Sequence, residues 1–257
     1  MDEELYEKIT RKKEFSQLPR KDVEIAMEKF GKKNLNDYQQ LKLIRQFLRK
    51  IFSSFSSRKV FSSTDRDSEW YLMKHKSTKE RFPHYKEVYE RCFKDFKKFS
   101  VIDLGAGING LTMTKEFLPK NVEVDYIGIE AIGQFVDLMK EFFKKNKIDA
   151  KAEHLSLFET EKIKKIIEES KKPRIVLLFK VIDSLESVER DYSKKLLKEI
   201  SPISDGIVVS FATRSLGNRK KFSAQRTWIV KFITENFDVV DDFEIGGERY
   251  IVFKKHN

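Results

Sequence analysis

The sequence is poor in the residues that build disulfides and metal sites, because its 257 residues include one cysteine and four histidines. The lone Cys92 cannot form an internal disulfide, and the scattered histidines lack the spacing of metal ligands, so we expect no structural metal. No apolar run approaches the roughly 20 residues that a membrane span needs. The opening residues MDEELYEKIT lack the basic start and apolar core of a secretion signal. The sequence therefore predicts a cytoplasmic protein with no metal and no membrane association.

Negative charge is also scarce in the first third of the chain. Residues 1–98 hold 25 Lys and Arg against 16 Asp and Glu, a balance of +9. Of the total charge of +11, the other 159 residues contribute 27 against 25, only +2. A basic segment beside a near-neutral one is typical of proteins that bind a polyanion, because each phosphate contact releases counterions. A generally lysine-rich composition is the alternative explanation.

Two amphipathic helices are predicted in this basic segment. Apolar residues recur along one helical face in residues 19–31, where Gly31 is a natural stop. In residues 34–52 they recur at intervals of three and four, while basic residues occupy much of the remaining surface. A serine-rich stretch without helical periodicity follows. We therefore predict a helical basic extension over residues 1–66 and a second domain over residues 67–257.

From residue 99 short β-branched runs alternate with helical stretches, which predicts an α/β fold with a parallel, doubly wound sheet. The predicted strands are FSVIDL, VEVDYIGIE, RIVLLFK and DGIVVSFA. At the end, residues 237–245 and 248–255 are joined by Gly246 and Gly247, which fits an antiparallel hairpin. A Rossmann-like sheet with a terminal antiparallel hairpin is the plan of class I S-adenosylmethionine-dependent methyltransferases.

The run VIDLGAGING, residues 101–110, predicts a ligand-binding loop between a strand and a helix. Glycines allow the backbone to approach a ligand closely, and the start of a helix offers free N–H groups. Gly105, Gly107 and Gly110 also satisfy the pattern G-x-G-x-x-G. Glu130 lies 20 residues beyond the last of them, so a dinucleotide such as NAD also fits.

Asp103 favours S-adenosyl-L-methionine over NAD as the cofactor. Its carboxylate stands two residues before the first glycine, where it suits the ammonium group of methionine better than a pyrophosphate. Glu130 ends the second predicted strand and can accept both ribose hydroxyls in either fold, so it does not discriminate. The terminal hairpin and the basic extension are both unusual in a simple dehydrogenase. Together these features predict a methyl donor.

Two further segments carry a more specific signal: KHKSTKERFPHY before the fold, and SFATRSLGNRKK on the fifth strand and its exit. They resemble the histidine-x-Ser-Thr-x-Glu-Arg and Ser-Phe-x-x-Arg/Lys-Ser-Leu-x-Gly/Asn-Arg/Lys motifs of the aminoglycoside-resistance 16S ribosomal RNA (guanine-N7) methyltransferases. The resemblance extends over nearly the whole chain and includes YIGIEA, FKVIDSL and ERYIVF.

The resemblance implies two sets of site residues. At the cofactor, Arg81 would hold the methionine carboxylate in a bidentate pair, Glu130 would take the ribose, and Leu155 would lie against the adenine. The other residues implied at the cofactor are His75, Ser77, Thr78, Glu80, Gly105 and Gly107. The residues implied to border the target guanine are Lys180, Ser210, Arg214 and Ser215.

The chemistry implied is methylation of a ring nitrogen. After the fourth strand the chain reads Lys180, Val181, Ile182, Asp183, and not the Asp/Asn-Pro-Pro-aromatic motif of enzymes that methylate exocyclic amines. Guanine N7 has a free lone pair and no proton to lose, so a general base is unnecessary. Phe211 would stack on a base turned out of its helix. Packing of Phe211 in the strand core is the alternative.

The implied substrate is 16S ribosomal RNA in the small ribosomal subunit, at a decoding-site guanine, with the basic extension docking on RNA and the enzyme acting as a monomer. This chain departs from the family pattern: Gly110 and Thr112 replace the Pro and Ala of Asn-Pro-Leu-Ala, and Glu130 replaces an Asp. Drug resistance and routine ribosome maturation therefore both stay open as roles. The alternative functions are a methyltransferase of another RNA or ring atom, and a non-catalytic RNA-binding or ribosome-assembly protein.

Overall fold

The N-terminal part of the protein is helical. The computed structural model describes residues 2–31, 35–53, 60, 66–213 and 226–256. Both predicted helices of the basic extension are confirmed, although the second ends in a π-helical turn. The elements that we call the N-terminal module are α1 (Glu3–Thr10), α2 (Arg20–Gly31), α3 (Asp37–Leu48) and η1 (Arg49–Ser53).

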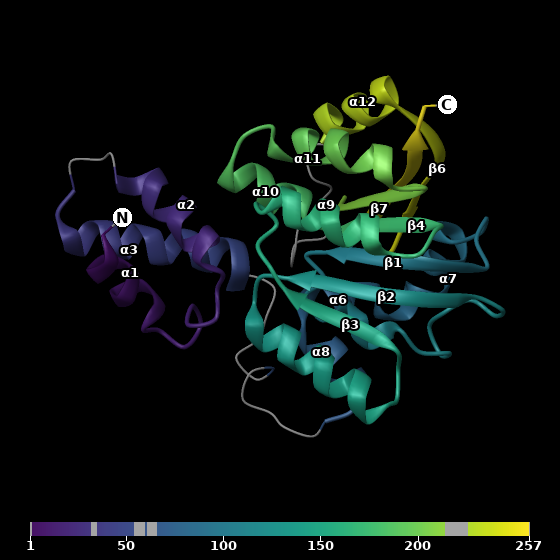
Figure 1. Cartoon of the computed structure of the whole chain (residues 1–257), viewed down its shortest axis with the longest axis horizontal. Helices are drawn as coiled ribbons and strands as arrows, with labels where there is room; N and C mark the ends of the chain where they lie inside the picture. Colours follow the sequence, from purple (N-terminus) through teal and green to yellow (C-terminus); the bar gives the residue numbers. More distant parts are fainter. Residues whose placement is uncertain (1, 32–34, 54–59, 61–65, 214–225, 257) are drawn as a thin grey trace.

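The rest of the chain is built on a seven-stranded sheet with the order β3-β2-β1-β4-β5-β7-β6 (Figure 1). Neighbours among β1 to β5 are parallel, and β7 is antiparallel to both β5 and β6. The strand order reverses between β1 and β4, and doubly wound sheets bind ligands at such a switch point. The strands are β1 (Lys98–Leu104), β2 (Glu123–Glu130), β3 (Ala150–His154), β4 (Arg174–Phe179), β5 (Gly206–Ala212), β6 (Phe237–Ile245) and β7 (Glu248–Lys255).

Helices cover both faces of the sheet, as the predicted α/β class requires. Successive side chains of a strand point to opposite faces, so Val101 packs in the apolar cluster under α7 and α8, and Ile102 packs in the cluster under α9, α11 and α12. The helices are α5 (Ser68–Lys74), α6 (Lys76–Arg81), η2 (Phe82–His84), α7 (Tyr85–Cys92), η3 (Asn109–Thr112), α8 (Gly133–Lys145), α9 (Thr160–Glu169), α10 (Ile182–Val188), α11 (Tyr192–Ile200), η4 (Ser201–Ile203) and α12 (Thr227–Asn236).

The terminal hairpin is confirmed. Gly246 and Gly247, which join β6 to β7, have φ angles of 62° and 80°. Both values lie in the left-handed region that two-residue hairpin turns use and that glycine adopts without a steric penalty. Gly246 is also constrained by packing, because a Cβ atom there would lie 2.5 Å from Cδ2 of His84.

The glycine loop is not followed by the α-helix that the sequence predicts. In its place stands η3, a 3-10 turn of four residues. The turn packs tightly against α8, since a Cβ atom on Gly110 would lie 2.8 Å from Sδ of Met139 and 2.9 Å from Cζ of Phe143. The helix N-terminus that we expected to offer free N–H groups beside the loop is therefore missing from this site.

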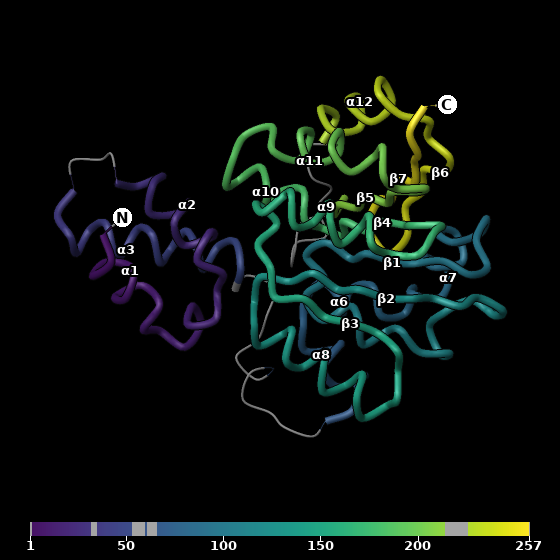
Figure 2. Tube along the Cα trace, viewed as in Figure 1, coloured from purple at the N-terminus to yellow at the C-terminus, as the bar shows by residue number. Residues whose placement is uncertain are grey.

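The N-terminal module lies beside the carboxyl ends of the central strands, as the trace shows (Figure 2). Gly133 N donates to Gln17 O over 3.3 Å, and Gln134 Nε2 donates to Lys13 O over 3.1 Å, which ties the module to the start of α8. Its buried apolar side chains, such as Ile9, belong to the same cluster as one face of the sheet. No helix in the described part of the chain is long and apolar enough to cross a membrane.

Candidate active site

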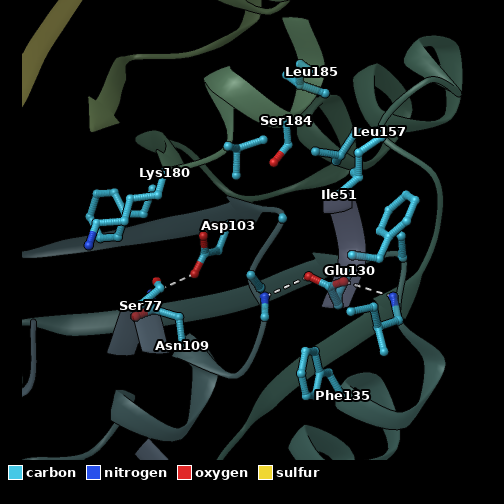
Figure 3. Close-up of a pocket in the computed structure, with 18 of the residues that line it drawn as sticks. Ile51, Ser77, Asp103, Asn109, Glu130, Phe135, Leu157, Lys180, Ser184 and Leu185 are labelled. Atoms are coloured by element: carbon cyan, nitrogen blue, oxygen red, sulfur yellow. Dashed lines mark hydrogen bonds between the residues drawn. The ribbon is translucent and has the colours of Figure 1, made fainter. Parts of the chain in front are cut away.

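A cavity opens at the switch point of the sheet, where β1, β2 and β4 end (Figure 3). It is bordered by the glycine loop, by the N-terminal module and by the segments from α6 to α10. The polar residues that line it are Asp22, His75, Ser77, Thr78, Arg81, Asp103, Asn109, Glu130, Lys180 and Ser184. Its apolar lining includes Ile51, Phe52, Ile132, Phe135, Leu157, Phe158, Phe179, Val181, Leu185 and Val188.

Two glycines line the cavity, and each has a positive φ angle and a different close neighbour. Gly105 has a φ of 72°, and a Cβ atom on it would lie 2.6 Å from Cγ2 of Val181. Gly107 has a φ of 55°, and a Cβ atom on it would lie 3.3 Å from Cε1 of His75. Any other residue would be strained at both positions. The structure thus brings both predicted glycines to the cavity.

Glu130 ends β2 and is fixed by the backbone around it. Its Oε2 atom accepts a hydrogen bond of 2.7 Å from Gly107 N, and its Oε1 atom accepts one of 2.8 Å from Ile132 N. Burial raises the pKa of this carboxyl group, and the backbone hydrogen bonds oppose that effect. The side chain is therefore held in one orientation at the wall of the cavity.

Asp103 is buried at the carboxyl end of β1 and also lines the cavity. Its Oδ2 atom accepts hydrogen bonds from Asn109 Nδ2 (2.7 Å) and from the Tyr126 hydroxyl (2.9 Å). Burial raises the pKa of Asp103, and these two neutral donors counteract the effect. A buried carboxylate with neutral donors on one side suits a ligand that brings a positive charge.

The guanidinium group of Arg81 contacts the protein on three sides. Its Nη2 atom donates to Glu248 Oε1 over 2.7 Å, Nε to the Tyr250 hydroxyl over 3.1 Å, and Nη1 to the Tyr85 hydroxyl over 3.4 Å. A guanidinium group has five N–H donors, so these three bonds leave two for a ligand. Arg81 lines the cavity, and its bonds to Glu248 and Tyr250 show that β7 positions the guanidinium group.

Lys180 follows β4 in a left-handed conformation with a φ of 58°. Its Nζ atom lies 2.6 Å from Glu80 Oε2 and 3.1 Å from Glu248 Oε2. Although burial opposes them, the Arg81 and Lys180 cations hold the pKa of Glu248 below its usual value. Ser210 on β5 donates to the same Glu248. A left-handed non-glycine residue is costly, and such residues are common at functional sites.

His75 is buried beside the glycine loop, and its ring lies edge-on to Phe135. Burial lowers its pKa to about 3, and the nearby Arg81 and Lys180 charges add to this effect. The ring is therefore neutral at physiological pH. The Thr78 hydroxyl lies 3.4 Å from His75 Nδ1 and donates to Leu72 O over 2.7 Å. These contacts fix the start of α6, which carries Arg81.

The other predicted site residues do not line the cavity or lie outside the described residues. Leu155 is buried just beyond β3 and does not line the cavity, whereas Leu157 does. Ser210 contributes through Glu248. Phe211 is buried in the core cluster under α9 and α11, which is the alternative that the sequence left open, and the stacking role stays a prediction. Arg214 and Ser215 lie outside the described residues.

Sequence reasoning missed residues that come from distant segments. Glu248 and Tyr250 stand in the ERYIVF strand, and Tyr126 stands in YIGIEA, which the sequence marks only as segments typical of the family. Asp22 belongs in the sequence to a predicted amphipathic helix. The one feature of the sequence that could have indicated its role is that this acid stands directly before the apolar residues of the helix.

The site disfavours the dinucleotide alternative. Pyrophosphate binding needs free N–H groups at a glycine loop that opens a helix. Here Gly107 N already donates to Glu130, and the short η3 turn replaces the helix. The carboxylates of Asp103 and Glu130 would also repel a pyrophosphate placed on the loop.

Solved structures share this fold over nearly the whole chain. The 16S rRNA methylase RmtB matches with a TM-score of 0.77 and 18% identity over 98% of each chain. The 16S rRNA methyltransferase RmtF, solved in complex with S-adenosyl-L-homocysteine, matches with a TM-score of 0.80 and 20% identity over 100% of each chain. At these identities the likeness shows the common fold, a class I methyltransferase sheet with an N-terminal helical part.

Sequence comparison identifies the family. The 16S rRNA (guanine(1405)-N(7))-methyltransferase of Micromonospora rosea is 26% identical over 185 residues, which cover 70% of this chain and 63% of that protein. The match thus spans less than two thirds of that relative. The family model of the ribosomal RNA methyltransferase FmrO matches residues 65–248. Because this match covers more than half of the chain, the protein belongs to the FmrO family of ribosomal RNA methyltransferases.

Proposed function

We propose that this protein methylates 16S ribosomal RNA in the small ribosomal subunit, at N7 of a decoding-site guanine, with S-adenosyl-L-methionine as the methyl donor. The observation that carries the proposal is the position of Asp103 and Glu130 beside the glycine loop, at the switch point of the sheet. The chain belongs to a family of ribosomal RNA methyltransferases, which supports the same reaction. The curated relative is named for the same reaction.

The cavity fits S-adenosylmethionine in its charge. Three carboxyl groups line it, from Asp22, Asp103 and Glu130. The two cations that line it, Arg81 and Lys180, are already paired with Glu248. A cofactor with an ammonium and a sulfonium group against one carboxylate has a net positive charge and complements such a lining.

Each end of the cofactor has a matching group in the cavity. Asp103 would accept from the ammonium group, and the two remaining N–H groups of Arg81 would hold the carboxylate. Glu130 would accept from the ribose hydroxyls. The neutral His75 ring adds no positive charge near the sulfonium. The glycines would let the backbone approach the ligand closely in a left-handed conformation that strains other residues.

The reaction requires little acid or base catalysis. S-adenosylmethionine supplies an electrophilic methyl group, and guanine N7 attacks it with a lone pair, so no proton has to leave first. What the protein supplies is orientation of the two reactants, which can lower a barrier by several kcal/mol. The buried pairs of Arg81 and Lys180 with Glu248 would keep the walls of the site rigid.

The basic N-terminal module would dock the enzyme, as a monomer in the cytoplasm, on the RNA of the small subunit. RNA duplexes reveal little sequence in their narrow major groove, so such an enzyme would read the shape of the assembled subunit. The module lines part of the cavity through Asp22, Ile51 and Phe52, which would place a docked RNA next to the methyl donor.

The test is methylation of purified small subunits by the full-length protein with methyl-labelled S-adenosylmethionine. We expect label in 16S RNA, and chain cleavage specific for 7-methylguanine should map it to one decoding-site guanine. Label in another RNA or at another ring atom would support the alternative function, a methyltransferase with a different target. Binding of small subunits with no binding of S-adenosylmethionine would support a non-catalytic assembly protein.

A further inference from the structure

Asp22 is a buried acid to which the proposed reaction assigns no contact with the cofactor. It is the third residue of α2 in the N-terminal module, and only 5% of its surface is exposed. Its Oδ2 atom has no hydrogen-bond partner. Acids in the first turn of a helix are normally solvated, and a buried polar atom without a partner is rare in folded proteins.

The surroundings of Asp22 on balance destabilise its charge. Burial raises its pKa to about 7, the Ser156 hydroxyl lowers it by hydrogen bonding, and the Glu130 and Glu159 carboxylates raise it further. Among the described residues Asp22 forms no ion pair. A carboxyl group in this position weakens the unliganded protein, because burial of a polar group without full compensation is unfavourable. Its position is therefore not explained by folding.

The side chain does line the cavity, and its neighbours identify which part. Ser156 follows β3, and Glu130 ends β2, so Asp22 stands over the carboxyl ends of these two strands. The apolar side chains of Leu157 and Phe158 line the cavity in the same region. Apolar walls with one inward hydrogen-bond acceptor suit a flat heteroaromatic ring that carries a donor.

We propose that Asp22 accepts a hydrogen bond from the exocyclic amine of the cofactor's adenine, so that the N-terminal module completes the cofactor site. This inference rests on the proposed function, in which Glu130 takes the ribose hydroxyls. The adenine amine is then the remaining hydrogen-bond donor of the adenosyl half. The unpartnered Oδ2 atom of Asp22 supplies the acceptor that this amine needs.

The module is fixed on both sides of the cavity, which positions Asp22. On one side Gly133 packs on Gln17, where a Cβ atom would lie 2.6 Å from Oε1. On the other side Lys29 Nζ donates to Ser187 O over 2.7 Å and to Val188 O over 3.0 Å, at the end of α10. Asp22 lies between these attachments along the chain. The module therefore presents its carboxyl group to the cavity in a defined place.

The experiment measures binding by calorimetry with two probes, S-adenosylhomocysteine and its analogue in which unsubstituted purine replaces adenine. The wild-type protein should prefer the adenine probe by roughly tenfold, as expected for one hydrogen bond to a charged group. Asp22→Ala should weaken binding of the adenine probe by a similar factor and leave the purine probe unchanged. Asp22→Asn keeps an acceptor oxygen and should keep most of the preference.

A matched control is Glu24→Gln, which changes an acid two residues away on the same helix that pairs with the exposed Arg20. It should preserve both affinities. An equal preference in the wild type and Asp22→Ala, or an equal loss of both probes in Asp22→Ala, would overturn the amine contact. Failure of the wild-type protein to bind either probe would instead overturn the proposed function.

Discussion

The buried ionisable side chains of the cavity differ in how well the protein compensates them. Arg81, Lys180 and Glu248 form a connected set in which each charge faces an opposite one. Asp22 faces two carboxylates and one hydroxyl. These two situations predict opposite consequences of substitution, because removing one partner of a buried pair leaves an uncompensated charge, whereas removing an uncompensated acid relieves one.

We expect Asp22→Asn to stabilise the unliganded protein at alkaline pH. The folded-state pKa of about 7 lies above the ordinary value of 3.8. Asp22 therefore disfavours the folded state increasingly as the pH rises from about 4 to about 7, and by a constant amount above that, up to roughly 4 kcal/mol. Denaturant unfolding at pH 4.5 and pH 8 should show a gain for the variant that is much larger at pH 8. The same gain at both pH values would contradict this account.

Arg81→Ala should weaken S-adenosylmethionine binding by roughly 1.5–3 kcal/mol, since it would remove the charge-assisted pair that we propose with the methionine carboxylate. Calorimetry checks the affinity, and Arg91→Ala is the control, because that guanidinium pairs with Asp241 on the surface. The substitution also takes away one cation that faces Glu248, so unfolding should be measured alongside. Arg81→Lys keeps the charge and should retain the fold, and an unchanged affinity in both variants would remove Arg81 from the cofactor site.

At the scale of elements, the three glycines of one loop have separate tasks. Gly105 and Gly107 have positive φ angles and face the cavity, while Gly110 lies where α8 packs on the loop. The sequence pattern treats the three alike. In space the first two line the cavity, where we propose that the cofactor binds, and the third packs against a helix.

We therefore expect Gly107→Ala and Gly110→Ala to differ. Gly107→Ala should lower cofactor affinity, because it strains the loop against His75. Gly110→Ala overpacks the contact with Met139 and should lower the stability by about 1–3 kcal/mol. Gly31→Ala, at a helical glycine with room for a Cβ atom, is the control and should be neutral. Calorimetry and thermal unfolding separate the effects, and identical profiles for the two loop variants would refute the division of tasks.

Elements with a strong apolar pattern were predicted correctly, and those without one were missed. The strands β4 and β5 carry nearly continuous apolar runs, because both faces of a parallel sheet are covered, and β1 and β2 keep shorter apolar runs. The edge strand β3 reads AKAEH and is mostly exposed, so nothing in its pattern distinguishes it from a loop. The prediction of an α-helix after the glycine loop was wrong for another reason. The short turn η3 occupies this place and packs tightly on α8.

At the scale of the whole molecule, the basic balance of the front third predicts an electrostatic interaction with RNA. Lys42 and Lys50 are exposed on the N-terminal module. Reversing both to Glu should weaken binding to small subunits and flatten the dependence of log affinity on log salt by about 1 for each phosphate that the variant no longer binds. Filter binding over a salt series measures both. Lys94 and Lys97, exposed before β1, provide a matched control pair whose reversal should leave binding nearly intact.

Removing residues 1–66 is a poorer test than the sequence alone indicates. From the sequence we expect cofactor binding to survive this truncation, because Arg81 and the glycine loop remain. In the structure Asp22, Ile51 and Phe52 line the cavity, and the module shares an apolar cluster with the sheet. The truncated protein should therefore lose cofactor affinity, which makes charge reversal in the full chain the cleaner experiment.

The class of fold, the glycine loop and the carboxylates beside it could be predicted from the sequence, because they depend on short-range patterns. The periodicity of a strand spans only a few residues, and Asp103, Gly105 and Gly107 lie within five positions of one another along the chain. The residues that complete the site could be found only in the folded chain: Glu248 contacts Arg81 from 167 positions away, and Asp22 lines the cavity from the N-terminal module. No local pattern records such contacts, because they are made by packing between distant segments.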